Sequence, residues 1–212
     1  MRLPAPPLLL ITNRQQAGGN ISSVAEAAFS AGCRWLSLRE KDLPEIEQRF
    51  LLRELLHLAQ RHHAKIVLHG DPKIARDAGA GGVHLPAGSD VTEARGLLGQ
   101  DALIGLSIHG AEEARAVDGT LVDYVIAGPV FETQSKPGYG PALGPDGLAL
   151  IVKASPVPVV AIGGIEAENI SDCLLAGAAA VAVMGSVMRA KDPADEVTEL
   201  IAALMAPQPR PR

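Results

Sequence analysis

The sequence predicts a (β/α)8 TIM barrel, and three observations lead to that fold class. Short apolar runs alternate with amphipathic stretches along the 212 residues, as is typical of parallel strands covered by helices. Three similar segments end an amphipathic stretch on an Ala-Gly pair, at Gly32, Gly79 and Gly177, and glycine readily adopts the left-handed conformation that ends a helix. The spacing of these glycines fits βα units of roughly 24 residues, so that eight units fill the chain.

Eight apolar runs are predicted as strands. The longest helix is expected between the second and third strands, over residues 43–63, with Pro44 in its first turn, where a missing N–H is tolerated. An open doubly wound sheet shares this alternation, but eight units without a long insertion favour the closed barrel. We expect the barrel domain to span residues 1–206, followed by a Pro-rich disordered tail over 207–212. In chain order the strands are Leu8 to Thr12, Trp35 to Arg39, Lys65 to His69, Gly82 to Leu85, Leu103 to Ser107, Tyr124 to Ala127, Val157 to Ile162 and Ala180 to Met184.

Composition narrows the class of partner. A formal charge of −5 without a run of Lys or Arg argues against nucleic acid and anionic membranes, so we expect a small-molecule ligand. No apolar run approaches the roughly 20 residues of a membrane span, and the run 8–11 is too short for a signal peptide. Cys33 and Cys173 fit neither a metal motif nor a disulfide framework, which suggests buried, inert thiols. A cytoplasmic protein is expected, and a homo-oligomer stays open.

Two glycine turns predict a phosphate site. Active sites of TIM barrels lie at the C-terminal ends of the strands, and the loops after strands seven and eight often hold a phosphate. Gly163-Gly164 follows the seventh predicted strand and Gly185-Ser186 the eighth, so backbone N–H groups can approach phosphate oxygens without an intervening Cβ. A helix expected to begin near Glu166 adds a favourable dipole. We therefore predict phosphate binding at Gly164, Gly185 and Ser186.

Charged and hydroxyl side chains follow two other strands. Arg39 and Lys41 come directly after the second strand, and a planar Arg beside a point-charge Lys suits a phosphate or pyrophosphate. Glu40, between them, is expected to lie at a solvated strand end in a local ion pair. The Gly- and Pro-rich loop after the sixth strand is predicted to grip an anion as a lid, because long loops in compact domains are usually functional. That loop carries Thr133, Ser135 and Lys136.

Three histidines follow or end predicted strands: His69, His84 and His109. Adjacent strand residues point to opposite faces, so either His69 or Asp71 reaches the barrel mouth, whereas His84 and His109 fit a packing role equally well. No set of His, Cys, Asp and Glu has the spacing of an HExxH or CxxC metal motif. We therefore expect no metal ligands and no cofactor.

These pieces together resemble the thiamine phosphate synthase/TenI family over nearly the whole chain. The resemblance implies a (β/α)8 barrel that binds a thiazole phosphate at the glycine turns. In the synthase branch it also implies a pyrimidine pyrophosphate gripped by Arg39, Lys41 and Lys136, with Ser107, Thr133 and Ser135 beside them. The motifs that carry the resemblance are "LREK" (38–41), "GVHL" (82–85), "GLSIH" (105–109), "DYVIAGPVFETQSK" (123–136), "AIGGI" (161–165) and "VAVMGS" (181–186).

Departures from the family pattern bear on the branch. Gly70 and Ser89 stand where the synthase branch has the two Asp ligands of its Mg²⁺, and Asp90 is one residue out of register. The motifs "HLPAGS" and "VFETQSKPG" resemble the TenI branch more closely. Some members of that branch isomerise a thiazole carboxylate phosphate without a metal. The catalytic His of that activity would fall at Pro129 here.

Three hypotheses follow. The first is a metal-independent thiazole tautomerase, in which His69 is the candidate for proton transfer. The second is a thiamine phosphate synthase, the one case in which Mg²⁺ is expected, with Asp71 and Asp90 as the possible ligands. The third is a non-catalytic regulatory or ligand-binding protein that keeps the barrel and its phosphate site.

Overall fold

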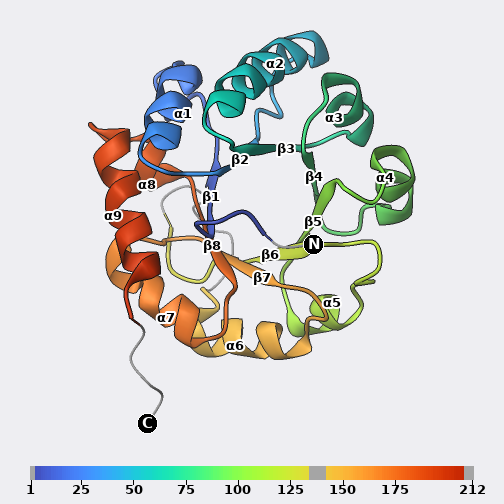
Figure 1. Ribbon diagram of the computed structural model, residues 1–212. Helices are drawn as coiled ribbons and strands as arrows, with labels where there is room; N and C mark the ends of the chain where they lie inside the picture. Colours follow the sequence, from blue (N-terminus) through green and yellow to red (C-terminus); the bar gives the residue numbers. More distant parts are fainter. Residues whose placement is uncertain (1–2, 134–141, 208–212) are drawn as a thin grey trace.

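The computed structural model describes residues 3–133 and 142–207, which form a closed barrel of eight parallel strands (Figure 1). Each strand pairs with the next in chain order, and β8 closes the barrel against β1. The predicted fold class is confirmed, and every predicted strand is present with its ends shifted by two residues or fewer. The strands are β1 Leu8–Ile11, β2 Trp35–Leu38, β3 Lys65–His69, β4 Gly82–Leu85, β5 Leu103–Ile108, β6 Tyr124–Ala127, β7 Val159–Ile162 and β8 Ala180–Val183.

The strands are apolar on both faces because each face meets a different part of the core. Leu9 and Val67 belong to the cluster inside the barrel, whereas Leu8, Leu10 and Ile66 pack between the sheet and the helices. Side chains alternate across a strand, so a run without polar interruptions fills both layers at once. This explains why most of the strands are predominantly apolar in sequence rather than alternating between apolar and polar residues.

Two large rings fill the interior of the barrel below its mouth. Trp35 and Tyr124 are fully buried and meet edge to face, with 4.8 Å between ring centroids. Small residues make room for them: Ala180 belongs to the same cluster, and Gly105 is the partner of Tyr124 in the neighbouring strand. A Cβ on Gly105 would stand 2.1 Å from the Tyr124 ring, so only glycine fits at this position.

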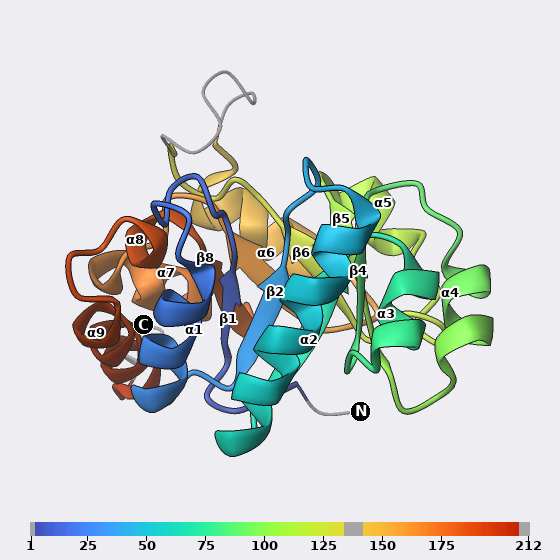
Figure 2. The ribbon, with the colours of Figure 1, turned by 90° about the horizontal axis from the view of Figure 1, so that it is seen from above.

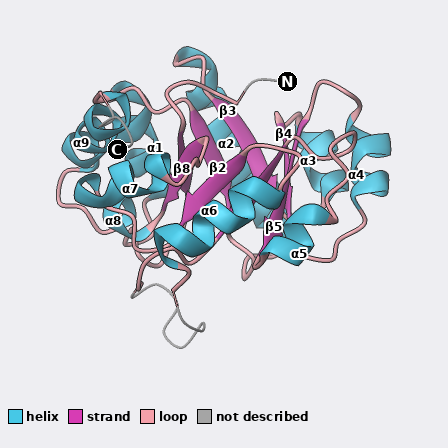
Figure 3. Ribbon diagram, turned by 90° about the horizontal axis from the view of Figure 1, so that it is seen from below, coloured by secondary structure: helices cyan, strands magenta, loops and turns pink. Residues whose placement is uncertain are grey.

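Helices surround the strands on the outside (Figures 1 and 3). The predicted joints are confirmed, since Gly32, Gly79 and Gly177 have φ of 104°, 76° and 93°. Pro44 is the residue before the first turn of α2 rather than part of it. The helices are α1 Ile21–Ser30, α2 Glu45–Arg61, α3 Pro72–Ala78, α4 Val91–Leu98, α5 Ala111–Arg115, α6 Gly144–Ala154, the 3-10 turn η1 Ala167–Asn169, α7 Ile170–Leu175, α8 Gly185–Met188 and α9 Pro193–Met205.

A buried ion pair fixes the starts of β5 and β6. Arg95 of α4 and Asp123 lie 2.7 Å apart, with 6% and 14% of their side chains exposed. Asp123 also accepts a hydrogen bond from the backbone N–H of Ile104 at 2.8 Å, and Arg95 donates to the carbonyl of Leu121. The Asp of the "DYVIAG" motif is therefore a structural residue, far from the ends of the strands that carry the predicted site.

The remaining predictions concern thiols, the tail and membranes. Cys33 and Cys173 are buried and unpaired, and burial raises the pKa of each thiol to about 11, as expected of inert cysteines. Most of the predicted tail, residues 208–212, lies outside the described residues. Among the helices of the described residues, none combines the length and the apolar character that crossing a membrane requires.

Candidate functional site

A cavity of about 700 Å³ opens at the C-terminal ends of the strands. The loops that follow these strand ends lie toward the upper edge of Figure 2. Small-molecule sites commonly occupy about 300 to 1,000 Å³, so this cavity has room for a ligand of substantial size. Two predicted residues of the loop after β6, Ser135 and Lys136, lie outside the described residues. The other predicted site residues line the cavity together: Arg39, Lys41, His69, Ser107, Thr133, Gly164, Gly185 and Ser186.

One side of the cavity, called the glycine half here, consists of the turns Gly163-Gly164 and Gly185-Ser186. Gly163 and Gly164 have φ of 101° and 62°, backbone angles that residues with a side chain rarely adopt. A Cβ on Gly164 would stand 2.3 Å from the carbonyl oxygen of Glu132, because the connection after β6 packs directly against this turn. The missing side chain thus makes room for that connection first, whereas the sequence pattern predicts that the space admits a phosphate.

Hydrogen bonds hold the first glycine turn in place. The Asn169 side chain donates to the carbonyl of Gly164 at 2.8 Å and accepts from the backbone N–H of Glu166 at 3.0 Å. The helix expected near Glu166 is a 3-10 turn followed by the six-residue α7, so its dipole is weaker than that of a long helix. The backbone of the Gly163-Gly164 turn is therefore held by Asn169 without a ligand.

A second part of the cavity, called the cationic half, begins with Arg39 and Lys41 after β2, which only β1 separates from β8 in the barrel. Both side chains line the cavity. Partial burial, followed by the charge of Arg39, lowers the pKa of Lys41. Within residues 3–133 and 142–207 neither cation forms an ion pair, so a bound anion would relieve the repulsion between them.

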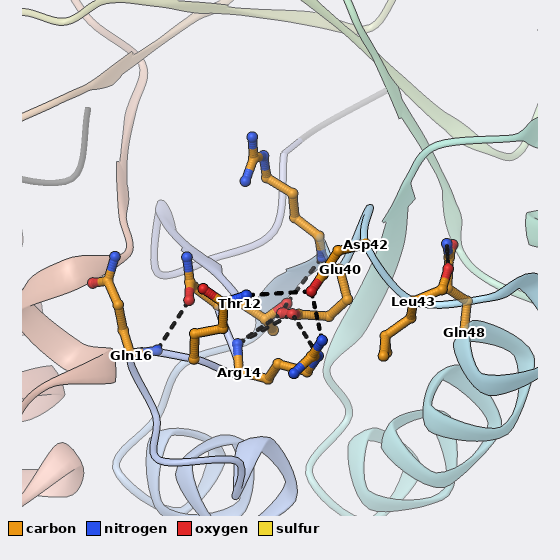
Figure 4. Close-up of polar contacts among 10 residues, drawn as sticks. Thr12, Arg14, Gln16, Glu40, Asp42, Leu43 and Gln48 are labelled. Atoms are coloured by element: carbon orange, nitrogen blue, oxygen red, sulfur yellow. Dashed lines mark hydrogen bonds and ion pairs between the residues drawn. The ribbon is translucent and has the colours of Figure 1, made fainter. Parts of the chain in front are cut away.

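Glu40 is buried, which corrects the expectation of a solvated strand end. Only 5% of it is exposed, and it accepts hydrogen bonds from the Thr12 hydroxyl at 2.7 Å and the Arg14 backbone N–H at 3.1 Å (Figure 4). The Thr12 oxygen in turn accepts from the backbone N–H of Arg39 at 2.9 Å, and the Arg14 guanidinium pairs with Asp42. These contacts join the ends of β1 and β2, so they fix the backbone from which Arg39 and Lys41 extend.

Histidine and serine side chains form the floor beside the two cations. His84 is 1% exposed, and its Nε2 shares a 2.9 Å hydrogen bond with the Ser107 hydroxyl. Burial, with smaller contributions from the charges of Lys41 and Arg39, lowers the pKa of His84 to about 3, so this ring is neutral at neutral pH. His69 is half-buried, lines the cavity and lies 4.9 Å from His84 between ring centroids.

His109 and Asp71 contribute less to the cavity. His109 lines its edge, but it is exposed and its Nδ1 lies 3.4 Å from Glu113 of α5. The Asp71 carboxylate caps α3 by accepting from the backbone N–H of Lys73 at 2.7 Å. Of the two alternatives at the end of β3, His69 is therefore the residue that lines the cavity.

The residues present do not fit a carboxylate-held magnesium ion. Gly70 offers no side-chain ligand, and the Ser89 hydroxyl donates to the carbonyl of Pro86 at 2.8 Å. Asp90, like Asp71, caps a helix, accepting from the backbone N–H of Thr92 at 2.9 Å. In the part of the chain that the structure describes, no three His, Cys, Asp or Glu side chains are placed to hold a metal ion. The oxygen ligands that Mg²⁺ prefers are thus missing from this donor set.

Sequence reasoning missed three cavity or loop residues: Asn13, Gln16 and Arg189. Asn13 and Arg189 line the cavity, and Gln16 hydrogen-bonds to Arg189 at 2.5 Å. A signal for Arg189 was available, because it stands four positions after Gly185, and such residues share a helix face. No sequence pattern marks Asn13 or Gln16, since both lie in an irregular loop after β1.

Comparisons of sequence and of structure find similarity to the same group of known proteins. The family profile described as thiamine monophosphate synthase matches residues 8–187. A Geobacter sulfurreducens protein named "Putative thiamine-phosphate synthase" is 42% identical over 205 residues, covering 96% of each chain. A thiamine-phosphate synthase of Streptococcus suis is 36% identical over 193 residues, covering 89% of this chain and 84% of the relative. Among solved structures, thiamine phosphate pyrophosphorylase from Pyrococcus furiosus has a TM-score of 0.82 at 28% identity, covering 93% of this chain and 94% of that one.

Proposed function

The chain belongs to the thiamine monophosphate synthase family, and from this membership we propose that it is a thiamine-phosphate synthase. The observation that carries the proposal is 42% identity, over 96% of both chains, to a relative with that name. This order reverses the expectation drawn from the sequence, which put a tautomerase first. The two sequence relatives reported above are named for the synthase and the solved structure for thiamine phosphate pyrophosphorylase, and none of them for a tautomerase.

The proposed reaction joins a pyrimidine pyrophosphate to a thiazole phosphate. The thiazole nitrogen attacks the methylene carbon of the pyrimidine, a C–N bond forms, and the C–O bond to pyrophosphate breaks. Pyrophosphate leaves with the bonding electrons, and no proton transfer is needed in that step. The cavity supports this assignment because it offers two separate regions for anions, the glycine half for the thiazole phosphate and the cationic half for the pyrophosphate.

Negative charge grows on the leaving pyrophosphate, so the side chains beside it are the ones that lower the barrier. Arg39 and Lys41 would stabilise that charge, and their unpaired positions at the mouth mean that little reorganisation is required. The Ser107 hydroxyl, held by His84, would orient the pyrimidine substrate beside them. Since the donor set does not fit Mg²⁺, no step is assigned to a metal. Arg39 and Lys41 would instead balance the negative charge of the departing pyrophosphate.

One observation favours a second candidate, the metal-independent tautomerase. Gly70 and Ser89 replace the carboxylates that the resemblance assigns to Mg²⁺, and a proton transfer on a thiazole carboxylate phosphate needs no such ligands. His69 would be the acid-base group, because Pro129 lines the cavity where the resemblance places the family histidine and a proline cannot exchange a proton. His69→Asn is expected to lower such an activity by about 100-fold or more. Full activity in that variant would exclude the role.

A turnover assay with each substrate set, in EDTA and in Mg²⁺, tests both candidates. Formation of thiamine phosphate from the two substrates supports the synthase, whereas isomerisation of the thiazole carboxylate phosphate alone supports the tautomerase. Turnover of neither, with thiazole phosphate still bound, would contradict both and leave the non-catalytic binder.

A double variant sharpens the metal question. Gly70→Asp with Ser89→Asp restores both carboxylates, and a Cβ at Gly70 meets only the Leu68 side chain, at an ordinary 3.9 Å. We expect synthase activity to rise with Mg²⁺ in the double variant and to change little in the natural chain. Activity of the natural chain that EDTA abolishes would contradict the metal-free assignment.

A further inference from the structure

Arg189 lies over the glycine half of the cavity. It follows α8, and a Cβ on Gly185 would stand 2.4 Å from its Nη1 and 2.8 Å from its Nη2. The guanidinium therefore rests directly against Gly185, in the space that a side chain there would fill. Arg189 lines the same cavity as Gly164 and Ser186.

A neutral partner holds the guanidinium in that position. Its Nη1 donates to the side-chain oxygen of Gln16 at 2.5 Å, although the two residues are 173 positions apart in the sequence. Gln16 is itself fixed, since its backbone N–H donates to the Asn13 side chain at 3.0 Å. Among the residues that the structure describes, the Arg189 side chain has no other hydrogen bond and no ion pair, so its remaining N–H donors and its full charge are available to a ligand.

A phosphate at the glycine half would fit this arrangement. The guanidinium offers five N–H donors in a rigid plane, which matches the oxygens of a phosphate group better than a Lys ammonium does. Only one of the five is used by Gln16, and the side chain is already placed, so little conformational freedom is lost on binding.

We infer that Arg189, oriented by Gln16, is a ligand of the phosphate group at the glycine half and that it makes the site selective for phosphorylated over unphosphorylated thiazole. The identity of the ligand rests on the proposed function, whereas the contact between Arg189 and a phosphate can be tested by itself. The role differs from that of Arg39 and Lys41, which belong to the cationic half.

The experiment compares charge-removing variants of two neighbouring cations. Dissociation constants for thiazole phosphate, for inorganic phosphate and for the thiazole alcohol are measured by isothermal titration calorimetry. Arg189→Gln is expected to weaken binding of both phosphates by about 10- to 100-fold, the range of a lost charged hydrogen bond, and to leave the alcohol unchanged. Arg189→Lys should lie between it and the natural chain. Gln16→Ala should weaken phosphate binding about 2- to 10-fold, because the side chain is no longer held.

Lys191→Gln is the matched control, since Lys191 is exposed, carries the same charge and does not line the cavity. It is expected to stay within twofold of the natural chain. Arg189 is exposed, so thermal unfolding should show the same melting temperature in all variants.

Equal losses in Arg189→Gln and Lys191→Gln would mean a general field effect and would overturn the inference. Phosphate binding within twofold of the natural chain in Arg189→Gln would overturn it as well, while leaving the proposed synthase untouched. A natural chain that binds neither phosphate would overturn both the phosphate site and the role of Arg189. Turnover of the natural chain, measured on the same preparation, tests the proposed function separately.

Discussion

The two halves of the cavity differ in whether backbone or side chains form their surface. The glycine half is mostly backbone, shaped by the positive φ angles of Gly163 and Gly164 and by the connection after β6 that packs against Gly164. The cationic half is made of side chains, and their positions depend on Glu40, Thr12 and other residues from neighbouring strands. The difference teaches that the turns of one half depend mainly on which residues lack a Cβ, with Arg189 and its distant partner Gln16 added to them, whereas the side chains of the other half extend from backbone held by contacts between distant parts of the chain.

The largest effect is expected in the glycine half. In Gly164→Ala the new Cβ would collide with the Glu132 carbonyl at 2.3 Å while the backbone keeps a strained φ of 62°. A shift of about 1 Å in such a site can cost about 100-fold, so we expect binding of thiazole phosphate to fall by at least that factor. Calorimetric titration measures it.

Gly79→Ala is the matched control for this change. Gly79 has a similar φ of 76°, but nothing lies within 4 Å of its missing Cβ. It should lose some stability and keep its affinity for the ligand. Equal affinity in the two variants would contradict the claim that the turn must pack against the connection after β6.

A substitution in the cationic half is expected to lower the turnover rate rather than to disturb the packing of the cavity. Lys41→Met removes one of the two charges beside the proposed leaving group, and losses of about 100-fold are usual when such a group is removed. Lys73→Met, at an exposed position of α3, should leave the rate unchanged. A rate in Lys41→Met within a few-fold of the natural chain would contradict the role given to the cationic half.

Sequence reasoning succeeded where the information is local. The eight strands and the turns at Gly164 and Gly185 could be predicted, because apolar runs and glycines between strand and helix depend on a few adjacent residues. The hydrogen bonds of Glu40 could not, since its partners Thr12 and Arg14 are 28 and 26 positions away. The same holds for the contact between Arg189 and Gln16.

Glu40→Gln tests how strongly the cationic half depends on these distant contacts. The amide oxygen can accept from the Thr12 hydroxyl. The amide NH2 group, however, would face the backbone N–H of Arg14, which now donates to both carboxylate oxygens of Glu40. We expect the free energy of unfolding to fall by about 1 to 3 kcal/mol, the cost of a lost charged hydrogen bond in a buried site. Urea unfolding measures it. Glu47→Gln, exposed on α2, should change it little, and similar stability in both variants would contradict the role of Glu40.

The smallest effect is expected in the pH dependence of stability, and it comes from the floor of the cationic half. Burial, with the charges of Lys41 and Arg39, lowers the pKa of His84 to about 3, well below the value of about 6.5 in an unfolded chain. Between pH 6.5 and pH 3 the unfolded chain therefore binds a proton that the folded chain excludes. Stability from this group is complete above pH 6.5 and falls with decreasing pH, by at most about 1.4 kcal/mol per pH unit.

His84→Gln removes the titrating ring while keeping a polar group that reaches Ser107. Urea unfolding of both proteins at pH 7.5, 6.5 and 5.5 isolates the contribution of His84, because the other ionisable groups are shared. The natural chain should lose more stability than the variant between pH 6.5 and 5.5, and the two should change in parallel between 7.5 and 6.5. Parallel curves throughout would mean that the folded chain protonates His84 as easily as the unfolded chain does. Neither burial of the ring nor the charges of Lys41 and Arg39 would then disfavour its protonated form, and the floor of the cationic half would be open to water.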